Sequence, residues 1–428
     1  MVTALLFGGF AVLVLINVPI AFALGMAIIV TILATDIVAL QVVAQRMFTA
    51  VDSFPLMAVP FFMIAGSVME KGGISKRLIR FANSLIGVLP GGLALVTILA
   101  SMFFAAISGS SPATVAAIGG IMIPAMVKNG YDEEFATATQ ASAGYIGVII
   151  PPSIPMVTYG VVTGASIGAM FMGGFIPGIF IGFMMALVAF FTSKKRNYRG
   201  RAEKPSIKEV ATSFVDAIWA ILMPVIILGG IYGGVFTPTE AANVAVVYGL
   251  FVGLFIYKEF RIRDLPKVLR ASAINASLVL LIVSAASVFG LLLTRENIPD
   301  TAANFLISVT DNPFYFLMLI NVLLLIVGTF METNAAILIL APILYPAVMQ
   351  MGIDPIHFGI IMVINLAIGM ITPPLGVNLF VAASMRQMSL ERLVHANWKY
   401  LFVSIFALIV ITYFPQLTLW LPNLLMGR

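Results

Sequence analysis

Nine apolar runs, several of them too long for one membrane crossing, constrain the fold more than any other feature of the sequence. They occupy residues 2–35, 53–70, 90–127, 133–192, 213–257, 271–293, 313–350, 355–385 and 397–425. A transmembrane helix needs about 20 apolar residues, so the longest runs must be interrupted. Proline or polar clusters interrupt them at Pro19, 108–112, Pro151–Pro152, Thr237–Pro238, 331–334 and Pro373–Pro374. The pattern predicts an all-α polytopic membrane protein with breaks at membrane depth.

The composition supports this class and excludes others. Hydrophobic residues make up 61% and charged residues 10% of the 428 residues, with a mean hydropathy of +1.10, whereas soluble domains have about 25% charged residues. The absence of cysteine and the presence of two histidines exclude thiolate and histidine-rich metal sites. The sequence has no GxxxxGK[ST] motif and no nucleophile–base pattern. We therefore predict a secondary active transporter, not an enzyme, with no organic cofactor and no nucleic-acid partner.

The two halves of the chain align without a gap at an offset of 222 residues. The clearest matches are Pro124 with Pro346, Gly130 with Gly352, Asp132 with Asp354, and Pro151–Pro152 with Pro373–Pro374. Shared prolines and glycines in one register favour an internal repeat over biased composition, and many transporters are built from inverted repeats. We predict a first inverted repeat at 1–192, a linker at 193–209 and a second repeat at 210–428.

Each predicted repeat contains a re-entrant helical hairpin, at 90–127 or 313–350, followed by a broken helix, at 133–164 or 355–385. If the linker is cytoplasmic, the inverted arrangement places 20 of the 23 lysines and arginines on that side. Such a bias is typical of cytoplasmic loops. The alternating basic and apolar residues of 74–88 predict an amphipathic helix on the cytoplasmic surface.

The hairpin tips carry polar clusters inside apolar runs. The first is Ser108–Thr114, whose hydroxyls and carbonyls are hard oxygen ligands that suit sodium; close packing of small residues is the alternative. The second is Gly328–Asn334, which contains the acid Glu332. An intramembrane acid can bind a cation, carry a proton, pair with Arg295, or cap the hairpin amides.

Tandem prolines mark the two breaks, in Ile150–Ser153 and Thr372–Asn378. Proline removes a backbone donor and frees a carbonyl, so each break creates two half-helix ends that can face an ion or an anion. Glu240 follows Thr237–Pro238 at a predicted helix start, where a structural role is favoured over a role in transport.

Six stretches resemble the large membrane subunit of tripartite ATP-independent periplasmic (TRAP) transporters. They are FPLMAVPFFMIAGSVMEKGGISKRL (54–78), FFAAISGSSPATVAAIG (103–119), GVIIPPSIPMVTYG (147–160), FTPTEAANVAVVYGL (236–250), GTFMETNAAILILAPILYP (328–346) and GMITPPLGVNLF (369–380). The resemblance implies an elevator-type carrier in the bacterial inner membrane, embedded in lipid. It also implies two partners, a small four-helix membrane subunit and a periplasmic substrate-binding protein that delivers an organic acid.

The resemblance further implies sodium (Na+) as the coupling ion, at two sites. The first would involve Ser108, Ser110, Ser111, Gly147 and Pro151, and the second Thr329, Thr333, Asn334, Gly369, Thr372 and Pro373. The organic acid, of the sialic acid or C4-dicarboxylate class, would bind between the tips. The residues expected to bind it are Ser111, Pro112, Thr114, Ser153, Glu332, Asn334 and Asn378.

Two other functions remain open from the sequence. One is a standalone divalent-anion symporter, possibly coupled to protons through Glu332. The other is a channel or a scaffold without transport activity, which would leave the paired polar tips without a role.

Overall fold

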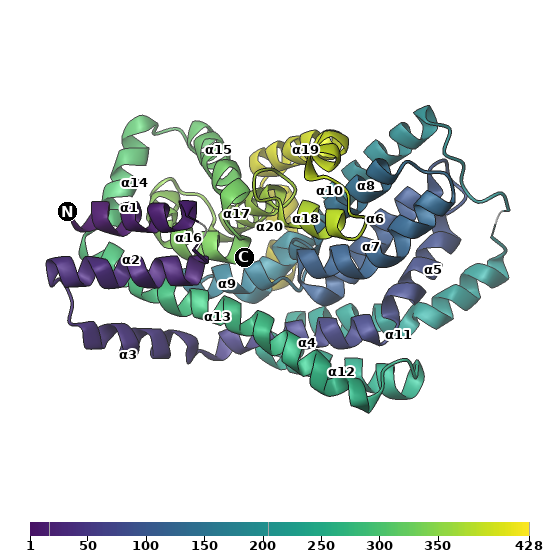
Figure 1. Ribbon diagram of the computed structural model, residues 1–428, viewed down its shortest axis with the longest axis horizontal. Helices are drawn as coiled ribbons and strands as arrows, with labels where there is room; N and C mark the ends of the chain where they lie inside the picture. Colours follow the sequence, from purple (N-terminus) through teal and green to yellow (C-terminus); the bar gives the residue numbers. More distant parts are fainter. Residues whose placement is uncertain (17, 204, 428) are drawn as a thin grey trace.

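The computed structural model describes residues 1–16, 18–203 and 205–427, and helices dominate this part of the chain (Figure 1). Nine of the helices in the described residues are long and apolar enough to cross a membrane. The all-α polytopic class is thereby confirmed.

The helices of the first half are short except for the last. They are α1 (Val2–Leu15), α2 (Ile20–Thr35), α3 (Leu40–Val51), α4 (Ala58–Lys71), α5 (Ile74–Ile86), α6 (Gly92–Ser108), α7 (Ser111–Lys128), α8 (Glu133–Tyr145), α9 (Ile154–Thr163) and α10 (Ile167–Lys195). A 3-10 turn, η1 (Phe54–Met57), precedes α4, and another, η2 (Ile146–Val148), follows α8.

The second half contains the longest helix of the described chain, α13. Its helices are α11 (Ile207–Tyr232), α12 (Pro238–Phe251), α13 (Leu265–Arg295), α14 (Ile298–Val309), α15 (Pro313–Phe330), α16 (Thr333–Gln350), α17 (Pro355–Gly369), α18 (Val377–Ser384), α19 (Leu390–Tyr413) and α20 (Gln416–Met426). A π-helical turn, η3 (Val252–Ile256), and a 3-10 turn, η4 (Ile262–Asp264), lie between α12 and α13.

The helix bounds of the two halves coincide at the offset of 222 residues. Helix α7 falls on α16 at both ends, and α6 falls on α15 to within one residue. The broken pair α8 and α9 likewise falls on α17 and α18. The 222-residue register therefore extends from a few matched residues to the helices themselves, whereas the inversion of the repeats across a membrane stays a prediction.

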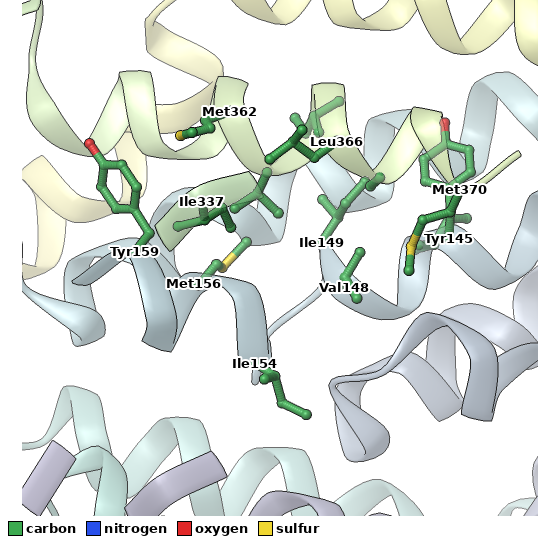
Figure 2. Packing of buried hydrophobic residues seen from close by; sticks show 14 of the residues in the cluster. Tyr145, Val148, Ile149, Ile154, Met156, Tyr159, Ile337, Met362, Leu366 and Met370 are labelled. Atoms are coloured by element: carbon green, nitrogen blue, oxygen red, sulfur yellow. The ribbon is translucent and has the colours of Figure 1, made fainter. Parts of the chain in front are cut away.

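The break of the first broken helix lies in the hydrophobic core. Figure 2 shows Val148 and Ile149 of the first break beneath Leu366 of α17, with Met156 of α9 beside Ile337 of α16. Helices α2, α3 and α4 pack along α13, which runs diagonally across the view in Figure 1. The molecule thus places the hairpins and broken helices on one side of α13.

Helix α5 differs from the expected membrane-surface helix. Its apolar side, which includes Leu78 and Phe81, packs against α6 and α11 and is buried by protein. Its basic side pairs Arg77 with Glu259 and Arg80 with Asp216. The amphipathic pattern of α5 therefore reflects an apolar side packed on protein and a basic side that forms ion pairs.

Candidate functional site

The first hairpin tip is tied to the broken helix of the other half. The Ser111 hydroxyl donates to Asn378 Oδ1 at 2.8 Å, and Asn378 Nδ2 donates to the Ala141 carbonyl at 3.1 Å. Ser111 and Asn378 are fully buried. Asn378 therefore joins α18 both to the tip and to α8.

The second tip makes the reciprocal connection. The Thr158 hydroxyl of α9 donates to Asn334 Oδ1 at 3.0 Å, and Asn334 Nδ2 donates to Glu332 Oε1 at 2.8 Å. Thr158 was not among the residues predicted from the sequence, because a threonine one turn into an apolar helix carries no local signal. Each tip is thus held by the broken helix of the opposite half.

Oxygen atoms gather around Gly147 at the first tip. The Thr114 hydroxyl lies 2.8 Å from the Ser110 carbonyl and 3.1 Å from the Ser108 hydroxyl. A Cβ atom built on Gly147 would lie 2.6 Å from Thr114 Oγ1 and 2.7 Å from the Ser110 carbonyl oxygen. Gly147 therefore packs closely against two of these three oxygen atoms, and hard oxygen ligands of this kind are the type that suits a small cation such as sodium.

Two other residues predicted for this group lie apart from it. Ser111 is turned toward Asn378. Pro151 is buried in the break, and it is the next residue, Pro152, whose carbonyl approaches Gly109. The structure thus joins Ser108, Ser110 and Gly147 of the first predicted sodium set.

The second predicted sodium set is less compact. Gly369 packs directly on the Gly328 backbone, and Leu375 N donates to the Thr329 carbonyl at 3.0 Å. The Thr333 hydroxyl is buried and has no hydrogen-bond partner within the described residues. Of the predicted second sodium set, the Thr333 hydroxyl is therefore the group that is available to coordinate an ion.

Other members of the second set are engaged elsewhere. The hydroxyls of Thr329 and Thr372 bond to carbonyls in their own turns, Ile326 and Ile368, each at 2.8 Å. Pro373 is exposed. Asn334 is occupied by Thr158 and Glu332, as described above.

A cavity of about 430 Å³ lies between the two tips and the helices α2, α4 and α13. Of the residues predicted to bind substrate, Pro112, Glu332 and Asn334 line it. Ser110 and Thr333, predicted for sodium, line it as well. The other residues predicted to bind substrate do not line the cavity and are buried in the tips and broken helices. They are Ser111, Thr114, Ser153 and Asn378.

The residues on the opposite wall of the cavity were not predicted from the sequence. It comprises Pro19, Ile20, Ala21, Phe22, Met63, Asn275, Leu278, Val279, Leu281 and Ile282. Asn275 is its polar member, on a helix without a proline break that could have drawn attention to it. The site is therefore formed between elements that are far apart in the sequence.

Several helix ends meet at this cavity. Helices α2, α9 and α16 begin at the lining residues Ile20, Ile154 and Thr333, and the cavity is also lined by Ser110 and Pro112 on either side of the first residue of α7. A helix N-terminus carries a partial positive charge, and the described lining contains no lysine or arginine. The ends of α6 and α17, at Gly109 and Met370, present the opposite charge. This arrangement can accept an anion beside a cation.

The two acids that the sequence analysis singled out, Glu332 at the cavity and Glu240 away from it, both cap helices. Glu332 is the N-cap of α16, and its Oε2 accepts from Ala335 N at 3.1 Å. Arg295, a possible partner of Glu332, instead donates to the Ile37 carbonyl at 2.9 Å. Glu240 forms a capping box with Thr237 at the start of α12, as the structural interpretation predicted.

The sequence matches the family described as "Tripartite ATP-independent periplasmic transporter, DctM component" over residues 7–417. The chain belongs to this family. The family name implies a tripartite system, with a small membrane subunit and a periplasmic component beside the large permease.

Two curated relatives support the assignment. The chain is 48% identical over 97% of its length to the isethionate TRAP transporter permease protein DctMQ of Oleidesulfovibrio alaskensis, and it spans 65% of that relative. It is 39% identical over 98% of its length to the C4-dicarboxylate TRAP transporter large permease protein DctM of Rhodobacter capsulatus, and it covers 99% of that protein.

Solved structures support the fold. The Alcanivorax borkumensis YdaH transporter superposes with a TM-score of 0.60 at 17% identity, covering 87% of this chain and 88% of the other. At that identity the likeness concerns the fold alone. The relatives are transporter permeases, so this multi-pass chain is a transporter subunit and not an enzyme.

Proposed function

We propose that this chain carries out sodium-coupled uptake of an organic acid across the bacterial inner membrane by an elevator mechanism. The observation that carries the proposal is the 430 Å³ cavity between the hairpin tips, where four helix N-termini meet and where none of the described lining residues is a lysine or an arginine. Helix N-termini bind anions without a formal positive charge, and a neighbouring sodium ion supplies the rest of the attraction.

In this proposal the first sodium ion binds at Gly147 and the second near Thr333. These places are supported by the oxygen atoms close to Gly147 and by the buried hydroxyl of Thr333, which has no hydrogen-bond partner among the residues that the structure describes. A cation at either place lies next to the cavity, so its charge favours the anion and the anion favours the cation. Binding of ion and substrate is then coupled, which is what symport requires.

The moving unit would consist of the hairpins, the broken helices, α10 and α19. The cavity lies between this group and α2, α4 and α13, which would belong to the static part. The reciprocal bonds Ser111–Asn378 and Thr158–Asn334 hold the two hairpins together as one body. Such a body can move past α13 while the bonds between the two tips stay intact.

For the substrate, we propose a small organic acid delivered by a periplasmic binding protein. C4-dicarboxylates are the first candidates, because the Rhodobacter relative is named for them and spans the same length. Isethionate, named in the Oleidesulfovibrio relative, and sialic acid are the further candidates. All are anions that suit a cavity formed by helix N-termini.

The decisive test compares melting temperatures of the chain, purified with its small subunit, in sodium and potassium at equal ionic strength. A ligand that binds only the folded state at tenfold excess over Kd stabilises it by ~1.4 kcal/mol. We expect a sodium-specific rise that Thr114→Val and Thr333→Val, made together, abolish, because they remove a hydroxyl beside Gly147 and the buried hydroxyl of Thr333. Equal melting temperatures in both salts would contradict sodium coupling.

Orientation has a separate test, which the structure sharpens. Ser193 in the linker is fully buried, so a cysteine there would be protected on either side of the membrane. Lys195, Gln387 and Asp300 are exposed and suit the experiment. With a cysteine-free background, Lys195→Cys and Gln387→Cys should resist an impermeant thiol reagent applied outside, whereas Asp300→Cys should react. Labelling at Lys195→Cys would overturn the cytoplasmic linker.

A standalone, proton-coupled symporter is the second candidate, because Glu332 lines the cavity. It predicts uptake by this chain without its partners, and loss of coupling in Glu332→Gln. Uptake into proteoliposomes containing only this chain distinguishes the two candidates.

A further inference from the structure

A second cavity, of about 730 Å³, lies away from the hairpin tips at the ends of α10 and α19. Its polar lining residues include Glu134, Arg196, Glu391, Arg392, His395 and Lys399. Apolar side chains such as Val188 and Val394 line the rest. The cavity is therefore amphipathic, unlike the apolar pocket between α6, α10 and α11.

The cavity lies at the boundary of the apolar spans. In α10 the first charged residues after Ile167 are Lys194 and Lys195, at its last turn. In α19, which packs against α10, Lys399 is the last charged residue before the apolar remainder of the helix. Both helices thus change from polar to apolar at the same cavity, as expected where membrane helices enter the headgroup region.

The ion pairs of the described residues leave one lysine, Lys399, and one carboxylate, the exposed Glu391, unpaired at this cavity. Arg392 pairs with Glu134 inside the cavity, and Arg196 pairs with Asp132, which does not line it. Lys399 is half-buried and has no hydrogen-bond or ion-pair partner within the part of the chain that the structure describes. A basic side chain close to hydrocarbon attracts an anion, because it is poorly hydrated there.

The rim of the cavity adds an aromatic side chain. Trp398 is 56% exposed and lies next to Lys399 in the sequence. Tryptophan is enriched at the headgroup level of membranes, where its ring contacts acyl chains and its N–H reaches polar groups. Basic cavities between membrane helices recognise lipid headgroups.

We propose that this cavity binds the phosphate of an anionic ligand, with Lys399 as its cationic partner. The phosphate can belong to an anionic phospholipid headgroup, whose acyl chains would lie on the apolar side along Val188, or to a soluble phosphate. The site is separate from the organic-acid cavity and does not depend on sodium or on the transported substrate.

The experiment uses Trp398 as the reporter. Trp219 and Trp420, the other two tryptophans, are replaced by phenylalanine. The full chain is placed in phosphatidylcholine nanodiscs that contain brominated phosphatidylglycerol or, for comparison, brominated phosphatidylcholine at the same mole fraction. Bromine quenches tryptophan only at short range, so quenching measures which lipid lies beside Trp398.

We expect brominated phosphatidylglycerol to be enriched beside Trp398 by about fivefold, the factor for one basic side chain at a membrane surface. Lys399→Gln should abolish the preference. Lys267→Gln, which removes an exposed lysine outside the cavity, is the matched control and should retain it. Should Lys399→Gln fail to fold, Val188→Phe fills the apolar side instead and should lower quenching by the anionic lipid.

A second arm separates the two sources of phosphate. Millimolar inorganic phosphate is added to discs of phosphatidylcholine alone, with chloride at equal ionic strength as control. A rise in melting temperature that Lys399→Gln removes would support the site with a soluble ligand. Equal quenching by both lipids together with no response to phosphate, or responses that Lys399→Gln leaves intact, would overturn the proposal.

Discussion

The two breaks share a register and differ in their surroundings. In the first, Ile149 to Ser153 are all buried, whereas in the second Pro373, Pro374 and Leu375 are exposed. Both breaks contain a Pro–Pro pair at matched positions, so the prolines themselves do not account for the difference. It lies in the helix that covers each break.

Glycines in α10 allow the close cover of the first break. Gly174 packs on the Ile149 carbonyl and Gly178 on Ile150, so closely that a Cβ on either would collide. At the offset of 222 residues, α19 has Ala396 and Tyr400 instead. The second break receives a single side-chain bond from that helix, from Asn397 Nδ2 to the Ile371 carbonyl at 3.0 Å. The first half is thus built around a sealed break and the second around an open one.

The two hairpin tips also differ, in that the first tip has no side-chain cap and the second has one. Ser110 precedes α7 without a side-chain cap, whereas Glu332 occupies the matched position before α16 and caps it. The backbone amides at the start of α7 therefore have no side-chain acceptor and can donate to a ligand in the cavity. At the start of α16, the Ala335 amide already donates to the Glu332 carboxylate. The comparison suggests that the anion binds nearer the first tip, where no fixed negative charge opposes it.

The largest expected effects come from the glycines that bring tips and breaks together. Gly369→Ala places a Cβ onto the Gly328 backbone, which cannot move aside as a side chain could. We expect loss of transport and destabilisation of more than about 3 kcal/mol, beyond the usual cost of overpacking. Gly147→Ala places a Cβ 2.6 Å from the Thr114 hydroxyl and 2.7 Å from the Ser110 carbonyl oxygen, a less severe overlap than the 2.2 Å at Gly369, and should cost less stability while still abolishing sodium-dependent stabilisation.

Uptake in proteoliposomes and thermal melting check both variants. Gly120→Ala in α7 is the control, since a Cβ there meets nothing within 4 Å. If Gly369→Ala transports normally, the close approach of the second tip to its break has no functional role.

The next largest effect is the difference in lost stability between substitutions in the buried first break and the exposed second break. Ile150→Ala removes a side chain that is 4% exposed and packs on Gly178, and should cost about 2–5 kcal/mol. Leu375→Ala, at a position that is 37% exposed, should cost about 0.5 kcal/mol or less. Comparable losses in melting temperature for the two variants would mean that a partner or lipid seals the second break as well.

A smaller effect is expected from the bonds that cross between halves. Asn378→Ala leaves Ser111 and the Ala141 carbonyl without a partner in a dry environment, which should cost about 1–3 kcal/mol. Thr158→Val removes the reciprocal bond to Asn334 and should cost less, because Glu332 still holds that amide. Melting temperatures rank the pair, with the exposed Ser384→Ala as control. The reverse ranking would show that the second tip depends more on the opposite half.

The positions at which the helices are interrupted could be predicted from the sequence because their signals are local. Tandem prolines interrupt helices wherever they occur, and the 222-residue register places the second tip once the first is known. The reciprocal bonds of Asn378 and Asn334 were out of reach, since they join residues brought together only by packing of the two halves. For the same reason, Asn275 on the far wall and the burial of Ser193 could not be anticipated.

The smallest expected effect concerns Glu332 and tests the contrast between the tips. In Glu332→Gln the amide oxygen can still accept from Ala335 N, so the cap persists and only its charge is lost. The loss of a charge at a helix N-terminus costs about 0.3–1 kcal/mol. We expect uptake to stay sodium-dependent, with a lower KM because a fixed negative charge has left the cavity. Uptake measured over a range of pH, with and without a sodium gradient, checks this. If coupling is lost instead, the carboxylate carries the driving proton, and the second tip is the functional counterpart of the oxygen cluster at the first.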